Sequence, residues 1–148
     1  MRRSAIAMLT LALAPVLATP ALAADPETNK KIVVEFYEKA LNQKDFDAAA
    51  KYFGPKYIQH NPNVPDGIEA FKGLVTMLKE KFPNSRSQIK RVIAEGDLVV
   101  LHVHSVREPS QRGRAIVDIF RLENGKIVEH WDVVQDIPEK AANDNTMF

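Results

Sequence analysis

The residue best suited to acid–base chemistry in this sequence is Asp118, an acid within an apolar stretch. Ile116 and Phe120 lie two residues before and after it, so the three side chains share one face of a predicted strand. Burial raises the proton affinity of a carboxyl group, and enzymes use this effect to tune a general acid or base toward neutral pH. We therefore predict that Asp118 is catalytic, with a buried structural acid as the alternative.

Two histidines, His102 and His104, lie on one face of the preceding predicted strand and are expected to face the same pocket. If the two strands pair through the loop at 108–113, His104 lies opposite or diagonal to Asp118. A carboxylate and an imidazole at that distance can share and move a proton. We predict that His104 is the second catalytic residue and that His102 binds substrate, with histidines packed on a sheet face as the alternative.

The remaining candidates are expected to lie at the rim and walls of this pocket. His60 lies in a turn-rich segment, where it either contacts substrate or caps the turn. Trp131 is expected to form a pocket wall, which places His130 and Asp132 on the outer face of the sheet. The predicted substrate-binding residues are His102, His60, Trp131, Tyr37 and Phe120.

Three helices in the first half of the chain are predicted from apolar residues at helical spacing. They span residues 26–42, 45–53 and 66–82. Pro26 suits the first position of a helix, and Gly54-Pro55 is expected to end the second one. Asp66 and Glu69 have the spacing of a capping box at the start of the third.

Four strands are predicted in the second half, over residues 85–94, 98–106, 114–122 and 126–137. Hairpin turns are expected at residues 95–97 and 123–125. Helices followed by hairpin-connected strands predict an α+β domain with helices on one face of an antiparallel sheet. The strand at 98–106 is apolar on both faces, so we expect the outer face to meet a second copy of the chain in a homodimer.

Composition excludes several classes of function. The absence of cysteine excludes disulfides, thiolate nucleophiles and cysteine zinc sites. The net charge is +1, and no basic stripe with interleaved aromatic residues is present, so no nucleic-acid partner is expected. A charge so near neutral also provides no electrostatic steering toward membranes or polyanions.

Residues 1–23 have the features of a cleavable signal peptide. Arg2 and Arg3 precede an apolar segment, and Ala21-Leu22-Ala23 fits a cleavage site. The apolar segment is too short for a membrane span, so no stable membrane insertion is expected. We predict cleavage after Ala23, a single domain over residues 24–148 and a periplasmic or secreted location, with an uncleaved anchor as the alternative.

The chain resembles the SnoaL-like polyketide cyclases of the nuclear-transport-factor-2-like superfamily. The matching segments are Phe36-Tyr37, residues 57–62, residues 118–122 and residues 125–132. The resemblance implies a cone-shaped fold, with three N-terminal helices packed on a curved antiparallel sheet around a deep pocket. It also implies an acid/base aspartate at Asp118 and a pocket histidine at His104, whereas His102 stands where the cyclases carry glutamine.

These observations predict a cofactor-free cyclase or isomerase that acts on a small apolar or carbonyl-containing molecule. Asp118 takes a proton next to a carbonyl group whose oxygen His104 or His102 polarises, and an aldol ring closure follows. The first alternative is a non-catalytic periplasmic domain that binds a small molecule or acts as a scaffold.

A metal-dependent enzyme is the second alternative, because Gly96, His102, His104 and Glu108 resemble the first cupin metal motif. The closing glycine and the second motif are missing, so we predict neither a metal nor a cofactor.

Overall fold

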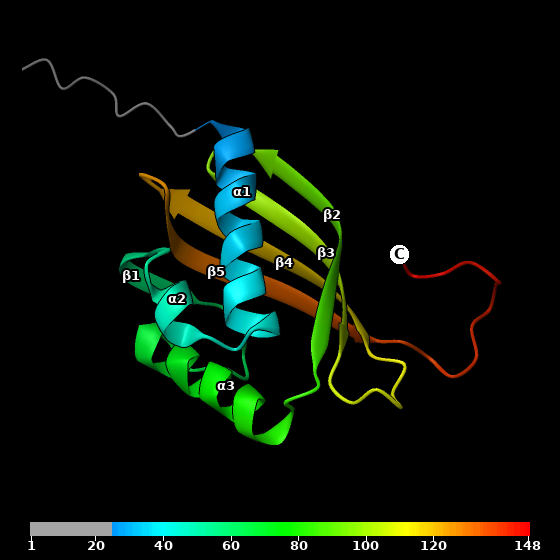
Figure 1. Cartoon of the computed structure of the whole chain (residues 1–148). Coiled ribbons are helices and arrows are strands. Elements are labelled where there is room, and N and C mark those ends of the chain that lie inside the picture. The colour runs from blue at the N-terminus through cyan, green and yellow to red at the C-terminus, as the bar shows by residue number, and fades with distance from the viewer. Residues whose placement is uncertain (1–24) are drawn as a thin grey trace, which may run out of the picture.

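The structure is a computed structural model that describes residues 25–148 (Figure 1). The predicted signal peptide, residues 1–23, lies outside the described residues. The helical elements are α1 (Pro26–Tyr37), the π-helix η1 (Glu38–Asn42), α2 (Phe46–Ala50) and α3 (Ile68–Lys81). The strands are β1 (Phe53–Gln59), β2 (Arg86–Glu95), β3 (Leu98–Val106), β4 (Arg114–Glu123) and β5 (Lys126–Asp136).

The five strands form one curved sheet in the order β1-β5-β4-β3-β2, with the helices on one side of it (Figure 1). This arrangement confirms the α+β class. The sheet is mixed and not antiparallel throughout, because β1 runs parallel to β5 while the other neighbours are antiparallel. None of the helices within residues 25–148 has the length and hydropathy needed to cross a membrane.

The prediction that Gly54-Pro55 ends a helix is wrong, because both residues lie in β1 at the edge of the sheet. Gly54 allows the close approach of β1 to β5, since a Cβ at this position would lie 2.7 Å from Val128 Cγ1. Pro55 has no N–H to donate, and it is tolerated because β1 is an edge strand with an irregular register against β5.

The first helix begins where the sequence predicts, whereas the start of α3 differs from the prediction. Pro26 begins α1 as predicted, and the first helix extends through Asn42 with its last residues widened into η1. The predicted capping box at the start of α3 is not formed. Gly67 is the N-cap residue, and Asp66 Oδ1 instead accepts a hydrogen bond from the backbone N–H of Gln59.

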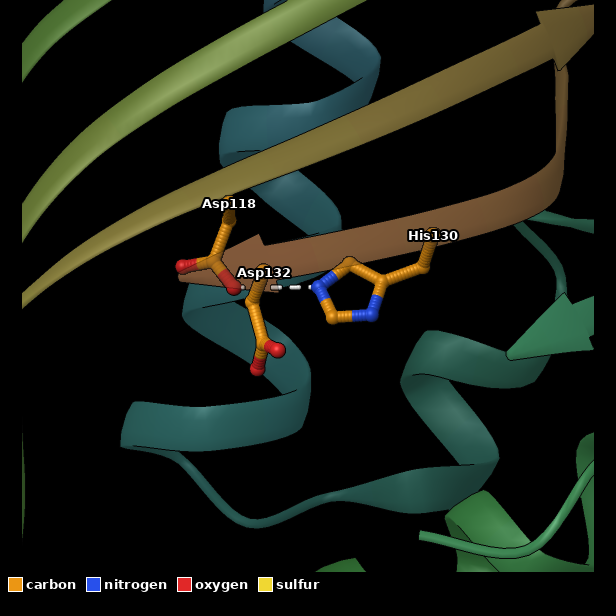
Figure 2. Close-up of side chains that lie close together, drawn as sticks. All are labelled: Asp118, His130 and Asp132. Atoms are coloured by element: carbon orange, nitrogen blue, oxygen red, sulfur yellow. Dashed lines mark hydrogen bonds and ion pairs between the residues drawn. The ribbon is translucent and has the colours of Figure 1, made fainter. Parts of the chain in front are cut away.

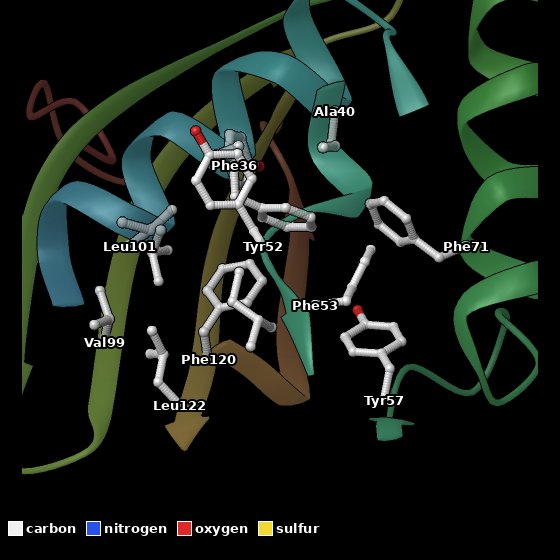
Figure 3. Close-up of a cluster of buried hydrophobic side chains, with 14 of the residues drawn as sticks. Phe36, Ala40, Tyr52, Phe53, Tyr57, Phe71, Val99, Leu101, Phe120 and Leu122 are labelled. Carbon is white, nitrogen blue, oxygen red and sulfur yellow. The ribbon is translucent and has the colours of Figure 1, made fainter. Parts of the chain in front are cut away.

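Aromatic side chains from α1, β1, α3 and β4 form the core between the helices and the sheet (Figure 3). The Phe36 ring contacts four others edge-on or tilted, with centroid separations of 5.1 Å to Phe53, 5.5 Å to Phe71, 5.8 Å to Phe120 and 6.3 Å to Tyr52. Each such contact contributes about 0.5–1.5 kcal/mol beyond area burial. This cluster fixes α1 over the sheet, and a cavity opens beside it.

Candidate active site

A cavity of about 780 Å³ lies between the helices and the inner face of the sheet. This volume falls in the range of small-molecule sites. Its apolar wall includes Phe36, Phe71 and Phe120, and a group of polar residues from β1, β4 and β5 faces the same space. Asp118 is among them, as the sequence predicted, and only 5% of its surface is exposed.

Two hydrogen-bond partners hold the Asp118 carboxyl group. The Tyr37 hydroxyl of α1 donates to Oδ2 at 3.0 Å, and His130 Nε2 of β5 lies 3.0 Å from Oδ1 (Figure 2). Each carboxylate oxygen has two lone pairs, so the carboxylate retains acceptor capacity for a ligand in the cavity. Loss of either partner leaves a buried polar group unsatisfied, which costs about 1–3 kcal/mol.

The protonation of His130 follows from its second partner, Gln59. The backbone N–H of Asn61 donates to Gln59 Oε1 at 2.9 Å, which fixes the orientation of the amide. His130 Nδ1 lies 2.9 Å from the same oxygen. Because this oxygen only accepts hydrogen bonds, Nδ1 carries a hydrogen.

The contact between His130 Nε2 and Asp118 Oδ1 therefore contains one proton. Nε2 of a neutral His130 with a hydrogen on Nδ1 is an acceptor, so the pair is either imidazolium with carboxylate or imidazole with carboxylic acid. One proton therefore lies between two buried atoms, Asp118 Oδ1 and His130 Nε2. Such a pair is suited to general acid–base chemistry.

Two buried tyrosines add neutral donors to the cavity wall. Burial, followed by the nearby negative charge of Asp118, raises the pKa of Tyr37 well above 10.0 and also raises that of Tyr57. Tyr57 accepts a hydrogen bond from Gln59 Nε2 at 3.2 Å, and its own hydroxyl hydrogen has no acceptor among residues 25–148. Tyr57 therefore presents a hydroxyl donor to the cavity.

Asp132 lies beside the pair and completes a group of three potential metal ligands, the one such group that the described part of the chain contains (Figure 2). One ligand atom each from Asp118, His130 and Asp132 lies within 4.8 Å of the others. Carboxylate and imidazole ligands suit divalent transition metals. A bound ion would have to replace the hydrogen bond between His130 and Asp118, since Gln59 already holds the other ring nitrogen.

The predicted approach of His104 to Asp118 is wrong. Asp118 pairs with Leu101 across the β3–β4 ladder, so its side chain shares the inner face with the buried Leu101. His102 and His104 have the opposite parity and lie on the outer face. The aliphatic residues of β3, not its histidines, face the helices.

The outer-face histidines have partners of their own. His104 Nε2 donates to the carbonyl oxygen of Arg112 at 2.9 Å, and His102 Nδ1 lies 2.9 Å from an Arg91 nitrogen. Both rings also contact Phe148, at centroid separations of 5.4 Å for His102 and 4.6 Å for His104. The two histidines therefore do not form the metal group that the cupin-like spacing suggested.

The parity predicted for β5 is also wrong. His130 and Asp132 lie on the inner face opposite Phe120 and Asp118, whereas Trp131 pairs with Ile119 on the outer face. The His60 ring stacks on Trp131 at 4.7 Å, and its Nε2 lies 2.8 Å from Glu129 Oε1. Neither His60 nor Trp131 lines the cavity, while Tyr37 and Phe120 do.

The chain belongs to the SnoaL-like polyketide cyclase family. The family model matches residues 31–142, which confirms the resemblance seen in the sequence. No curated protein matches the chain.

Solved structures show the same fold at low sequence identity. TsrD from Streptomyces laurentii is 21% identical with a TM-score of 0.63, over 74% of this chain and 90% of that one. An NTF2-like protein of unknown function from Cytophaga hutchinsonii is 21% identical with a TM-score of 0.61, over 72% and 89%. Another from Burkholderia xenovorans is 18% identical with a TM-score of 0.64, over 78% and 89%. The chain therefore has the nuclear-transport-factor-2-like fold.

Proposed function

We propose that this protein is a cofactor-free cyclase or isomerase that moves a proton on a small carbonyl compound. The observation that carries this proposal is the hydrogen-bonded pair of Asp118 and His130 on the wall of the cavity. A buried carboxylate and imidazole that exchange one proton match the requirements of a general acid–base catalyst. Membership of the cyclase family supports the same reaction class.

In this mechanism, ionised Asp118 removes a proton from the carbon next to the substrate carbonyl. His130 holds Asp118 in position and carries the proton that compensates its charge. In a ring closure, the enolate carbon attacks a second carbonyl group, and the proton held by Asp118 passes to the new alkoxide. The product is an isomer of the substrate, so the reaction needs no added reactant.

Tyr57 is the proposed donor to the carbonyl oxygen, in place of His104 or His102. Its hydroxyl hydrogen lacks an acceptor among residues 25–148, and its raised pKa keeps the hydroxyl protonated. A neutral donor at this place stabilises the negative charge that develops on the enolate oxygen. Its removal should lower the rate more than it lowers affinity for the substrate.

The alternative function is that of a periplasmic domain that binds a small molecule without changing it. The size of the cavity and its aromatic wall support binding as such. The periplasmic or secreted location remains a proposal that rests on the features of residues 1–23.

The proposed homodimer is supported by the outer face of the sheet. Ile93, Val117 and Val133 are exposed there, at 59%, 37% and 68%. Single exposed apolar residues are ordinary, but several on one sheet face form a surface that a second copy can cover.

Ring closure of dicarbonyl compounds tests the proposed function. Purified protein is incubated with a series of 1,5- and 1,6-diketones, and isomeric cyclic products are followed by chromatography and mass spectrometry. We expect Asp118→Asn to lower the rate about 10²- to 10⁴-fold, the usual contribution of a general acid or base. Asp144→Asn is the matched control, because Asp144 is exposed beyond β5. Equal rates for the Asp118→Asn and wild-type proteins would exclude the mechanism.

A further inference from the structure

Arginine side chains gather at one end of the cavity, away from Asp118 and Asp132. Arg107, Arg112 and Arg114 all line it, and they lie on or beside the loop that joins β3 to β4. Arg114 and Asp118 share the inner face of β4, four residues apart, so their Cα atoms are separated by about 13 Å at the usual strand rise. The cavity therefore has an acidic middle and a basic end, where three arginines lie with one carboxylate, Asp136.

Arg112 at this end is exposed, whereas Arg107 is more buried and lacks a carboxylate partner among the described residues. Among the described residues it forms no ion pair, and it is half-buried with its guanidinium carbon 5.2 Å from the centre of the Phe82 ring. Its pKa is lowered by burial and by the nearby charge of Arg114. A guanidinium group stays charged in proteins, so this end of the cavity contains a positive charge without its counter-ion.

None of the ionisable groups beside Arg107 provides it with a counter-ion among the described residues. Arg114 pairs with Asp136 at 3.1 Å, but Asp136 is 84% exposed and the pair is solvated. Lys44 is buried, and its Nζ donates to the carbonyl oxygens of Asn42 and Ser85. Arg86 pairs with Val106, which places Ser85 at the same end of the sheet as Arg107.

We propose that Arg107 and Arg114 form a subsite for a carboxylate group of the ligand. A guanidinium fork matches a carboxylate with two parallel hydrogen bonds, and Ser85, Ser87 and Ser110 line the same cavity. This inference builds on the proposed function, because it takes from that function the ketone as the reacting group of the ligand. The ligand is a small keto acid, with its carboxylate at Arg107 and its ketone between Asp118 and Tyr57.

A pair of ligands that differ only in charge tests the subsite. The probes are 3-benzoylpropanoate and its neutral amide, 3-benzoylpropanamide, with binding measured by titration calorimetry. We expect the acid to bind about tenfold or more tightly, because a hydrogen bond from a guanidinium to a carboxylate is stronger than one to a neutral amide. This preference should shrink when the salt concentration rises from about 20 to 500 mM, because salt screens partly exposed charges.

Variants of Arg107 test whether this residue causes the preference for the acid over the amide. Arg107→Met should abolish the preference for the acid, whereas Arg107→Lys should retain part of it. Arg91→Met is the matched control that should keep it, because Arg91 pairs with His102 on the outer face. Equal affinity for acid and amide in the wild-type protein, or no binding of the acid at millimolar concentration, overturns the proposal without reference to any variant.

The subsite and the proposed reaction can fail separately. Asp118→Asn should keep the preference for the acid while it loses turnover, since Asp118 belongs to the acidic part of the cavity. If diketones are cyclised but acid and amide bind equally, the carboxylate subsite is wrong and the reaction stands. If the acid is preferred but the wild-type and Asp118→Asn proteins react equally, the reaction is wrong and the subsite stands.

Discussion

His130 and His104 differ in the partners of their ring nitrogens. His130 connects Gln59 to Asp118 inside the cavity, so a change in its protonation acts directly on the carboxylate. His104 donates to the carbonyl oxygen of Arg112 from the opposite side of the sheet. It therefore affects the cavity only by holding the loop that carries Arg112, and we regard it as a positioning residue.

Tyr37→Phe should destabilise the protein by about 1–2 kcal/mol at neutral pH, because Asp118 loses a buried hydrogen-bond donor. The variant should also change the alkaline limb of the stability curve. Burial raises the pKa of Tyr37 above 10.0, so the stability that its neutral phenol contributes is complete below pH 10.0 and is lost as pH rises above it. The variant should lose less stability above that pH than the wild type does.

Urea unfolding at a series of pH values measures both effects of this substitution. Tyr52→Phe serves as the control for the effect at neutral pH, because the Tyr52 hydroxyl donates to Glu35 in a part-buried contact away from Asp118. Suppose that Tyr37→Phe had the wild-type stability at neutral pH and lost as much stability above pH 10.0 as the wild type does. The contact between Tyr37 and Asp118 would then contribute nothing to the free energy of unfolding.

The loop between β3 and β4 depends on Gly113, which has a φ of +85°. A Cβ at this position would meet the Ser105 carbonyl oxygen and would lie 2.8 Å from Val106 Cγ2. Gly113→Ala should therefore lower the free energy of unfolding by about 2 kcal/mol or more. It should also displace the arginines at the basic end of the cavity, which weakens binding of the keto acid probe.

Gly73→Ala is the matched control for this loop prediction. Gly73 lies in α3 with no atom within 4 Å of a built Cβ, so alanine should stabilise the helix by about 0.5–1 kcal/mol. Thermal unfolding compares the two variants. Equal melting temperatures for the two alanine variants would show that the left-handed conformation at Gly113 costs an alanine nothing.

Local signals predicted most of the elements. Alternation and turn residues placed β2, β3, β4 and β5 to within one residue at each end, and α1 began at Pro26 as expected. β1 was not predicted over its full length because its partner, β5, is about seventy residues away. Only the parallel pairing with β5 explains why Gly54 and Pro55 lie in a strand. A long-range edge pairing has no local sequence signal.

The site was predicted only in part, because it also depends on long-range strand pairing. Asp118, Tyr37 and Phe120 were correctly placed on one cavity, but alternation gives only relative parity within a strand. β3 is apolar on both faces, and the register of β4 against β5 shifts between Arg121 and Leu122. The inner placement of His130 therefore depended on pairing that the sequence does not encode locally.

On the scale of the whole molecule, the two faces of the sheet have different roles. The inner face carries the cavity, while the outer face carries His102, His104 and Trp131 next to exposed aliphatic side chains. Phe148 covers the two histidines and leaves Val133 exposed at 68%. The exposed part is the surface proposed for a second copy.

Val133→Lys should convert the proposed dimer to a monomer, because two lysines would face each other in an apolar interface. Sedimentation velocity measures the mass of the wild-type and variant proteins. Thr76→Lys adds the same charge on an exposed part of α3 and should leave the mass unchanged. A wild-type protein that sediments as a monomer, or a Val133→Lys dimer, would argue against this interface.

The most direct test of the central claim is the exchange of hydrogen for deuterium next to a ketone. Proton NMR in D₂O follows the carbon-bound hydrogens next to the carbonyl of 3-benzoylpropanoate and of simple diketones, with wild-type, Asp118→Asn, His130→Gln and His104→Gln proteins. We expect the wild-type protein to accelerate exchange, and both Asp118→Asn and His130→Gln to lose about 10²-fold or more of that acceleration. His104→Gln should retain most of it, since His104 lies on the outer face. No exchange above the buffer rate with any compound, or equal exchange by the wild-type and Asp118→Asn proteins, would contradict acid–base catalysis by this pair.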